Sequence, residues 1–155
     1  MQNLALRKAR DVASRTRRGI VVGSDTLVVL GRFVLGKPSS SKDARRMLRR
    51  LSGRSHMVYT GVAIVDAVSG ASRVFYERTK VTFRKISGRE IAAYVRSGSP
   101  LDKAGAYGIQ DDFGAVFVEK VSGCFYTVVG FPLSRFYTEL ERFRRRLSSK
   151  TTRRR

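Results

Sequence analysis

Helix patterns and strand patterns alternate along this chain, and the alternation restricts its fold more than any other feature. Two segments open on a capping pattern, Ser40 with Asp43 and Ser87 with Glu90, and continue with apolar residues at helical spacing. The predicted elements are a helix over 2–14, short strands over 20–22, 27–30 and 34–35, a helix from 40 that stops before 53, strands over 58–66 and 73–84, a helix from 87 to about 97, a strand over 115–121 and a C-terminal helix from 133. This order predicts an α/β fold with a mixed, twisted sheet flanked by helices.

Composition indicates one globular domain and excludes several classes of protein. The length of 155 residues with 42% hydrophobic residues fits a single compact domain. Apolar runs such as 61–65 are far shorter than the roughly 20 residues of a transmembrane helix. The charged N-terminus lacks the apolar stretch of a secretory signal. With one cysteine, Cys124, expected in a turn or packed near Gly123, there is no internal disulfide or cysteine-based zinc site, and we expect a reducing, cytoplasmic location.

The chain is strongly basic, with 32 Lys and Arg against 12 Asp and Glu and a formal net charge of +20. The two ends, 1–18 and 142–155, are its most basic parts. This charge favours polyanions such as nucleic acid, an acidic membrane surface or a phosphorylated substrate. The arginine runs 144–146 and 153–155 are explained either by a solvated tail or by contact with nucleic acid, and the sequence leaves both open.

A polar segment, Gly23 to Thr26, interrupts a predicted buried strand. Within it Asp25 is flanked by hydrophobic residues on both sides, where an unpaired carboxylate is costly to desolvate. Such a residue is either a metal ligand or general base, or a carboxylate that accepts backbone N–H groups. Lys37 follows in a Gly-Lys-Pro turn, and its compact charge suits a phosphate contact, although an exposed loop lysine gives the same pattern.

The loop over 103–110 carries spaced glycines that let a backbone approach a flat or anionic ligand. Gln110 at its end has an amide with both a donor and an acceptor, which suits recognition of a base edge. The spacing matches neither a Walker motif nor a dinucleotide-binding motif. His56, the one histidine, is expected to be a hydrogen-bonded turn residue rather than a catalyst.

Five motifs together resemble a known family. In chain order they are Ser24-Asp25-Thr26-Leu27-Val28-Val29, Gly36-Lys37-Pro38, Leu51-Ser52-Gly53-Arg54-x-His56-x-Val58-x-Thr60-Gly61, Lys103-Ala104-Gly105-Ala106-Tyr107-Gly108-Ile109-Gln110 and Val128-Val129-Gly130-Phe131-Pro132-Leu133. Their order and spacing resemble the Maf (septum-formation-inhibitor-like) family of nucleoside triphosphate pyrophosphatases over about residues 4 to 143. The resemblance implies a Maf-like domain over 1–143 and a basic tail over 144–155. The Ala-Tyr-Gly-Ile-Gln form of the loop looks like the branch that acts on dTTP and UTP.

The resemblance implies hydrolysis between the α- and β-phosphates to a nucleoside monophosphate and pyrophosphate, with a divalent cation, Mg²⁺ or Mn²⁺. The family's catalytic, metal-binding aspartate falls on Asp25. Lys37 matches the lysine that contacts phosphate, and Lys8 matches another basic residue of the family's site. Thr26 and Gln110 match positions that influence the choice of base.

One departure from the family pattern concerns the N-terminus. Members begin with a strand and a Ser-x-Ser-Pro-Arg-Arg loop that grips the triphosphate, and this chain looks like a member shortened there. An uncovered sheet edge would favour association, so a homodimer is expected. Two alternatives stay open from the sequence, an inactive paralogue that still binds nucleotides and a basic nucleic-acid-binding module.

Overall fold

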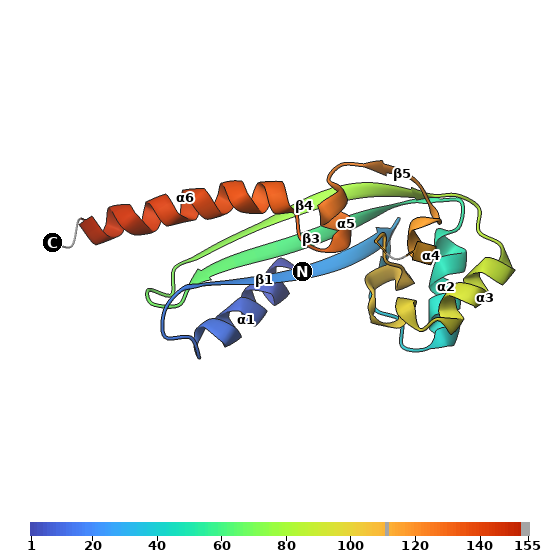
Figure 1. Cartoon of the computed structure of the whole chain (residues 1–155), viewed down its shortest axis with the longest axis horizontal. Coiled ribbons are helices and arrows are strands. Elements are labelled where there is room, and N and C mark those ends of the chain that lie inside the picture. The colour runs from blue at the N-terminus through green and yellow to red at the C-terminus, as the bar shows by residue number, and fades with distance from the viewer. Residues whose placement is uncertain (111, 153–155) are drawn as a thin grey trace.

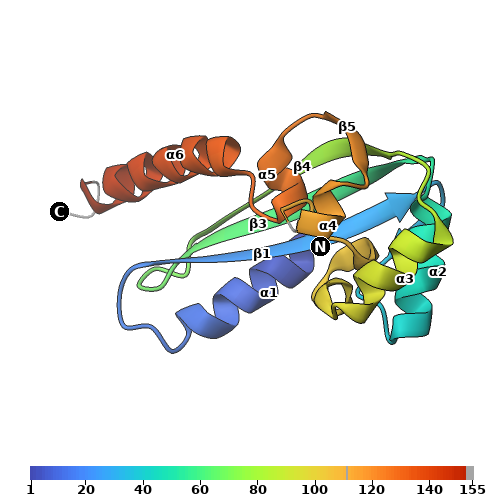
Figure 2. The same ribbon diagram turned by 45° about the vertical axis from the view of Figure 1, so that its right-hand side comes forward.

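The computed structural model describes residues 1–110 and 112–152, which form a long, curved sheet with helices along it and a helical lobe at one end (Figures 1 and 2). In chain order the elements are α1 (Gln2–Ala13), β1 (Ile20–Leu30), β2 (Phe33–Leu35), α2 (Ser41–Leu51), β3 (Ser55–Asp66), β4 (Ser72–Phe83), α3 (Gly88–Arg96), the 3₁₀ turns η1 (Ser99–Asp102) and η2 (Ala104–Ala106), α4 (Asp112–Ala115), β5 (Val118–Ser122), α5 (Phe125–Val129) and α6 (Leu133–Thr152). The α/β fold predicted from the sequence is confirmed, and both predicted caps form: Ser40 and Ser87 accept the backbone N–H of Asp43 and Glu90.

The sheet has the strand order β2-β1-β3-β4-β5. Every pairing among these described strands is antiparallel, so the prediction of a mixed sheet was wrong in this respect. Short turns join β1 to β2 and β3 to β4, which permits only antiparallel neighbours. The helix α2 connects β2 to β3, and these two strands do run the same way, but β1 lies between them.

Helix α1 lies unusually close to the sheet because glycines face it. A Cβ atom on Gly23 of β1 would lie 2.5 Å from the carbonyl oxygen of Ala5, and one on Gly61 of β3 would lie 3.0 Å from the backbone nitrogen of Gln2. On the helix side, Ala5 and Ala9 are fully buried in the contact. Small residues on both surfaces therefore bring the first turns of α1 against β1.

The helical lobe at the end of the sheet contains the main hydrophobic core. Helices α2 and α3 pack there with the two 3₁₀ turns against the ends of the strands (Figure 2). Its largest fully buried side chains include Leu48, Phe83, Tyr94 and Phe117. The rings of Tyr94 and Phe117 meet edge to face with centroids 5.2 Å apart. This packing fixes the segment after α3, which forms one wall of the cavity described below.

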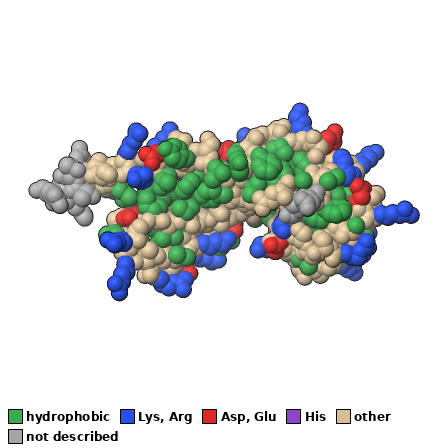
Figure 3. Space-filling model, in the orientation of Figure 1, with side chains coloured by type: hydrophobic (Ala, Val, Ile, Leu, Met, Phe, Trp, Pro, Cys, Tyr) green, Lys and Arg blue, Asp and Glu red, His purple; other side chains and the backbone are tan. Residues whose placement is uncertain are grey.

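Helix α6 extends along the opposite end of the sheet (Figure 1). Phe143 is buried against the strands, and Arg73 of β4 donates to Glu139 over 2.8 Å. Exposed hydrophobic residues gather on α5 and the start of α6, where Figure 3 shows a continuous apolar face. The helix runs unbroken past residue 143, and the arginine run 153–155 lies outside the described residues. No helix in the described part of the chain combines the length and apolar character needed to cross a membrane.

In the C-terminal half, one predicted strand boundary was wrong and one helix was not predicted. The strand expected over 115–121 begins only at Val118, because residues 112–115 form the short helix α4. Gly114 of α4 packs so tightly on the preceding loop that a Cβ would lie 2.1 Å from the carbonyl oxygen of Gly108. Helix α5 was not predicted at all, whereas Cys124 does lie in the turn beside Gly123, just before α5.

Candidate active site

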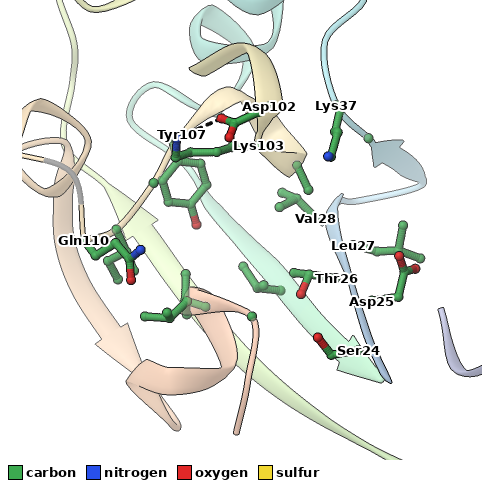
Figure 4. A pocket seen from close by; sticks show the side chains of 18 of the residues that line it. Ser24, Asp25, Thr26, Leu27, Val28, Lys37, Asp102, Lys103, Tyr107 and Gln110 are labelled. Atoms are coloured by element: carbon green, nitrogen blue, oxygen red, sulfur yellow. Dashed lines mark hydrogen bonds and ion pairs between the residues drawn. The ribbon is translucent and has the colours of Figure 1, made fainter. Parts of the chain in front are cut away.

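One cavity of about 610 Å³ brings together all five site residues predicted from the sequence (Figure 4). They are Lys8, Asp25, Thr26, Lys37 and Gln110. They come from α1, from the middle of β1, from the turn after β2 and from the loop after η2. Segments separated by up to a hundred residues thus line a single space.

Strand β1 contributes to this cavity from both of its faces. Side chains alternate along a strand, and Figure 4 shows Asp25 and Thr26 on opposite sides of the β1 ribbon. The cavity reaches both because β2 pairs only with residues 28–30 of β1. Among the described strands, residues 20–27 pair with β3 alone, so their other edge is open. The ligand space therefore wraps around the open edge of β1.

On one face of β1, Asp25 pairs with Lys8 of α1. The Lys8 Nζ lies 2.8 Å from Oδ1 of Asp25 and 3.4 Å from the carbonyl oxygen of Ser24. The carboxylate is 14% exposed and the lysine 51%. The close packing of α1 on Gly23 brings the helix that carries Lys8 against the strand that carries Asp25.

The helical lobe contributes Lys37 and, next to it, the loop over residues 103–110. The carbonyl oxygen of Gly36 accepts the N–H of Gly105 over 3.0 Å, which ties the turn after β2 to η2. Lys103 donates to the backbone oxygen of Ser99 and to the carboxylate of Asp102, and the bond from Lys103 holds the pKa of Asp102 below its usual value. Figure 4 shows Lys37 and Lys103 on the same side of the cavity. This end of the site is rich in ammonium groups.

An aromatic cluster holds residues 107 and 108 of the loop that leads to Gln110. The Tyr107 hydroxyl lies 2.8 Å from Nε2 of His56, and the Tyr94 hydroxyl accepts the N–H of Gly108 over 3.1 Å. Burial raises the pKa of Tyr107 and lowers the pKa of His56 to about 4, so both are neutral at pH 7. His56 lies inside β3 and is 3% exposed, so the expected turn position was wrong and its role is to support the loop.

On the other face of β1, a chain of hydroxyl groups runs from the cavity into the protein. The Thr26 and Thr60 hydroxyl oxygens lie 2.9 Å apart, and the Thr60 hydroxyl donates to the carbonyl oxygen of Thr127 in α5 over 2.7 Å. Thr60 is fully buried. Thr60 belongs to one of the five sequence motifs, but its role was not predictable, because its position opposite Thr26 depends on the register of β1 and β3.

A divalent cation fits this site only as one shared with a substrate. Among the described residues, no three His, Cys, Asp or Glu side chains come together in a group that would hold a metal by itself. Asp25 is the carboxylate on the open edge of β1 that faces the cavity. Mg²⁺ commonly binds through one or two carboxylates together with substrate phosphates and water, which is compatible with this arrangement.

Comparison with known proteins agrees with the motifs. The family described as Maf-like protein matches residues 1–143. The chain belongs to the Maf family. It is 49% identical over 143 residues to the dTTP/UTP pyrophosphatase of Bacillus cereus strain AH820, a match that covers 92% of this chain and 73% of that protein. The Bacillus anthracis protein of the same name gives the same identity and coverage, and that of Bacillus cereus strain ATCC 10987 is 48% identical with 69% of its length covered.

Proposed function

We propose that this Maf-family chain is a nucleoside triphosphate pyrophosphatase that hydrolyses the α–β phosphate bond of UTP and dTTP. The observation that carries the proposal is the single cavity shared by Asp25, the site lysines and Gln110. The Bacillus relatives named dTTP/UTP pyrophosphatase, at 49% identity, support the same substrates. Water attacks the α-phosphorus, the bond to the bridging oxygen breaks, and pyrophosphate leaves the nucleoside monophosphate behind.

The face of β1 that carries Asp25 is assigned to the triphosphate. Asp25 is the proposed catalytic residue, since its carboxylate can orient the attacking water and accept its proton. Lys8 holds that carboxylate over 2.8 Å and is close enough to contact a phosphate bound beside it. Lys37 faces the same cavity from the turn after β2, where an ammonium group offsets the charge that builds on the leaving pyrophosphate.

Asp25 is also the residue that would hold a divalent cation, together with phosphate oxygens of the substrate. When bound, Mg²⁺ or Mn²⁺ would neutralise phosphate charge and lower the pKa of a bound water. The protein would contribute the Asp25 carboxylate as a ligand and would hold it on the open edge of β1.

The face of β1 that carries Thr26 is assigned to the base. Thr26 and Gln110 line this end of the cavity, and Tyr107 lies beneath the loop between them (Figure 4). The Gln110 amide has a donor and an acceptor for a base edge. The aromatic cluster that supports the loop keeps this end rigid, which favours selection among bases by hydrogen bonding.

Product analysis in ¹⁸O-labelled water tests the proposal. The purified chain is incubated with UTP, dTTP, CTP or ATP and with Mg²⁺ or Mn²⁺, and nucleotides are separated by anion exchange. We expect UMP and pyrophosphate from UTP, with the label in UMP, because the water attacks the α-phosphorus. UDP with free phosphate, or label in pyrophosphate, would refute the assignment, and nucleotide binding without turnover would favour the inactive paralogue.

A second candidate function, contact with nucleic acid, is supported by a group of arginines on and beside α6. Four arginines line a cavity of about 340 Å³ between β4 and α6 around Phe143. Two of them, Arg73 and Arg142, pair with Glu139, whereas Arg145 and Arg146 have no ion pair within the described part of the chain. Binding to a fluorescent single strand that weakens steeply with salt, and that is lost in an R145A/R146A variant, would support this role. The expected homodimer and cytoplasmic location stay predictions.

A further inference from the structure

Thr60 controls the direction of a hydrogen bond at the edge of the cavity. Its hydroxyl lies between the Thr26 hydroxyl, 2.9 Å away, and the carbonyl oxygen of Thr127, 2.7 Å away. A hydroxyl has one proton, and a carbonyl oxygen can only accept. The Thr60 proton is therefore committed to Thr127, and the proton of the Thr26 hydroxyl must be donated to Thr60.

This direction leaves Thr26 with lone pairs alone for a ligand. Thr26 is half-buried in the cavity wall, and its side chain points into the same space that Tyr107 borders (Figure 4). A free threonine hydroxyl would rotate to donate or accept as the ligand requires. Here the buried relay removes that choice. Thr26 presents an acceptor to whatever occupies this end of the cavity.

We propose that Thr60 is a positioning residue that makes Thr26 an obligate acceptor, so that the site selects a base whose ring nitrogen at this edge carries an N–H donor. The inference deepens the proposed function and rests on it. Uracil and thymine carry an imide N–H between two carbonyl groups, whereas cytosine has an acceptor nitrogen at the same ring position. Two acceptors facing one another leave both unsatisfied in a buried site, which disfavours cytosine. Gln110 does not supply this discrimination by itself, because its amide can rotate to suit either base.

If Thr60 served only to anchor α5, its loss would not change the preference between UTP and CTP. Another buried threonine provides a matched control for this alternative. Thr79 of β4 is also buried and donates to the carbonyl oxygen of Cys124, the N-cap of α5, over 2.9 Å. Thr60 and Thr79 thus both anchor α5 to the sheet, but only Thr60 also contacts Thr26. Loss of anchoring alone would affect UTP and CTP equally in either variant.

The test compares Thr60→Val, Thr60→Ser and Thr79→Val. The affinities for UTP and CTP are measured by calorimetry in EDTA, where no metal-dependent turnover occurs, and kcat/KM is measured with Mg²⁺. We expect Thr60→Val to reduce the UTP-over-CTP preference about tenfold, the effect of one hydrogen bond, because the Thr26 hydroxyl then rotates freely. Thr60→Ser should retain the preference, and so should Thr79→Val even if its thermal stability falls.

An unchanged preference in Thr60→Val, or an equal loss in Thr79→Val, would overturn the inference. If Thr60→Val does not fold, Thr26→Val gives the second test, since removal of the acceptor should weaken UTP binding without weakening CTP binding. A preference that depends on Thr60 in EDTA, without pyrophosphate release in Mg²⁺, would refute the proposed activity and leave the relay standing. Failure of the wild-type chain to bind either nucleotide would overturn both.

Discussion

The two faces of strand β1 reach the same cavity by different physical means. On the Asp25 face the contact is between charges, and Lys8 is half exposed to solvent. On the Thr26 face the contact is between neutral hydroxyl groups, and Thr60 is fully buried. A charged pair near solvent tolerates small shifts, because its interaction falls off slowly with distance. A buried hydroxyl relay depends on direction, so it suits discrimination between ligands of equal charge.

This difference follows from where β1 lies in the sheet. The alternation of side chains sends Asp25 and Thr26 to opposite faces, and the short β2 leaves the edge beside them open. Helix α1 then covers one face, and α5 with the loop to Gln110 covers the other. Under the proposed function, two consecutive residues of one strand would serve the phosphate-binding end and the base-binding end of the cavity.

The largest expected effect is the loss of turnover in Asp25→Asn, a change on the Asp25 face that should leave the base preference of the Thr26 face intact. Asp25→Asn should lower pyrophosphate release from UTP by at least about a thousandfold, because the amide can neither accept the water's proton nor bind a cation well. The fold should persist, since Lys8 is half exposed and stays solvated without the pair, and asparagine keeps the shape of the aspartate side chain. Two quantities are measured, kcat for UTP and the calorimetric affinities for UTP and CTP in EDTA. The affinities should still favour UTP in the variant.

The matched control is Asp11→Asn, which removes one negative charge from the exposed side of α1, where Asp11 pairs with Arg15. It should hydrolyse UTP at the wild-type rate. Comparable loss in both variants would show that net charge rather than this carboxylate controls the rate. Near-normal turnover in Asp25→Asn would refute the catalytic role of Asp25.

The sequence predicted the parts of this comparison that depend on local pattern. The helix caps at Ser40 and Ser87 depend on neighbours within a few residues, and they are confirmed. The strand arrangement was not predictable in the same way, since hydrophobic periodicity does not distinguish parallel from antiparallel pairing. Nor was the relay from Thr26 to Thr60, because it needs the register of strands 34 residues apart. The roles of the five site residues stay predictions, although the cavity contains all of them.

The next largest effect is expected from Gly23→Ala, which should disturb the Asp25 face and leave the Thr26 face unchanged. In Gly23→Ala the new Cβ would lie 2.5 Å from the carbonyl oxygen of Ala5, so α1 must move away from β1 and carry Lys8 with it. We expect the free energy of unfolding to fall by about 1–3 kcal/mol, the usual cost of overpacking. Turnover of UTP should fall as well, whereas the UTP-over-CTP preference should remain.

Gly88→Ala is the control for this change, since a Cβ on Gly88, the first residue of α3, meets nothing within 4 Å. Its urea midpoint should equal or slightly exceed that of the wild type. A Gly23→Ala variant of normal stability would mean that α1 does not depend on this close contact.

The smallest expected effect is a pH-dependent loss of stability that arises from His56, on the Thr26 face. Burial lowers the pKa of His56 from 6.5 to about 4 in the folded chain, so the unfolded chain takes up a proton first as the pH falls. The contribution of neutral His56 to stability is therefore complete above about pH 6.5 and declines as the pH falls toward 4. Between pH 7.5 and pH 5 this amounts to about 2 kcal/mol of unfolding free energy.

Urea denaturation of the wild type and of His56→Gln at the two pH values measures this contribution, because His56 is the one histidine in the sequence. The wild type should lose about 2 kcal/mol more than the variant on acidification. The UTP-over-CTP preference should weaken along with stability, since His56 holds Tyr107 under the loop that carries Gln110. Parallel pH profiles for the two proteins would mean that His56 is hydrated rather than buried, and the rigid wall assigned to the base end would lose its support.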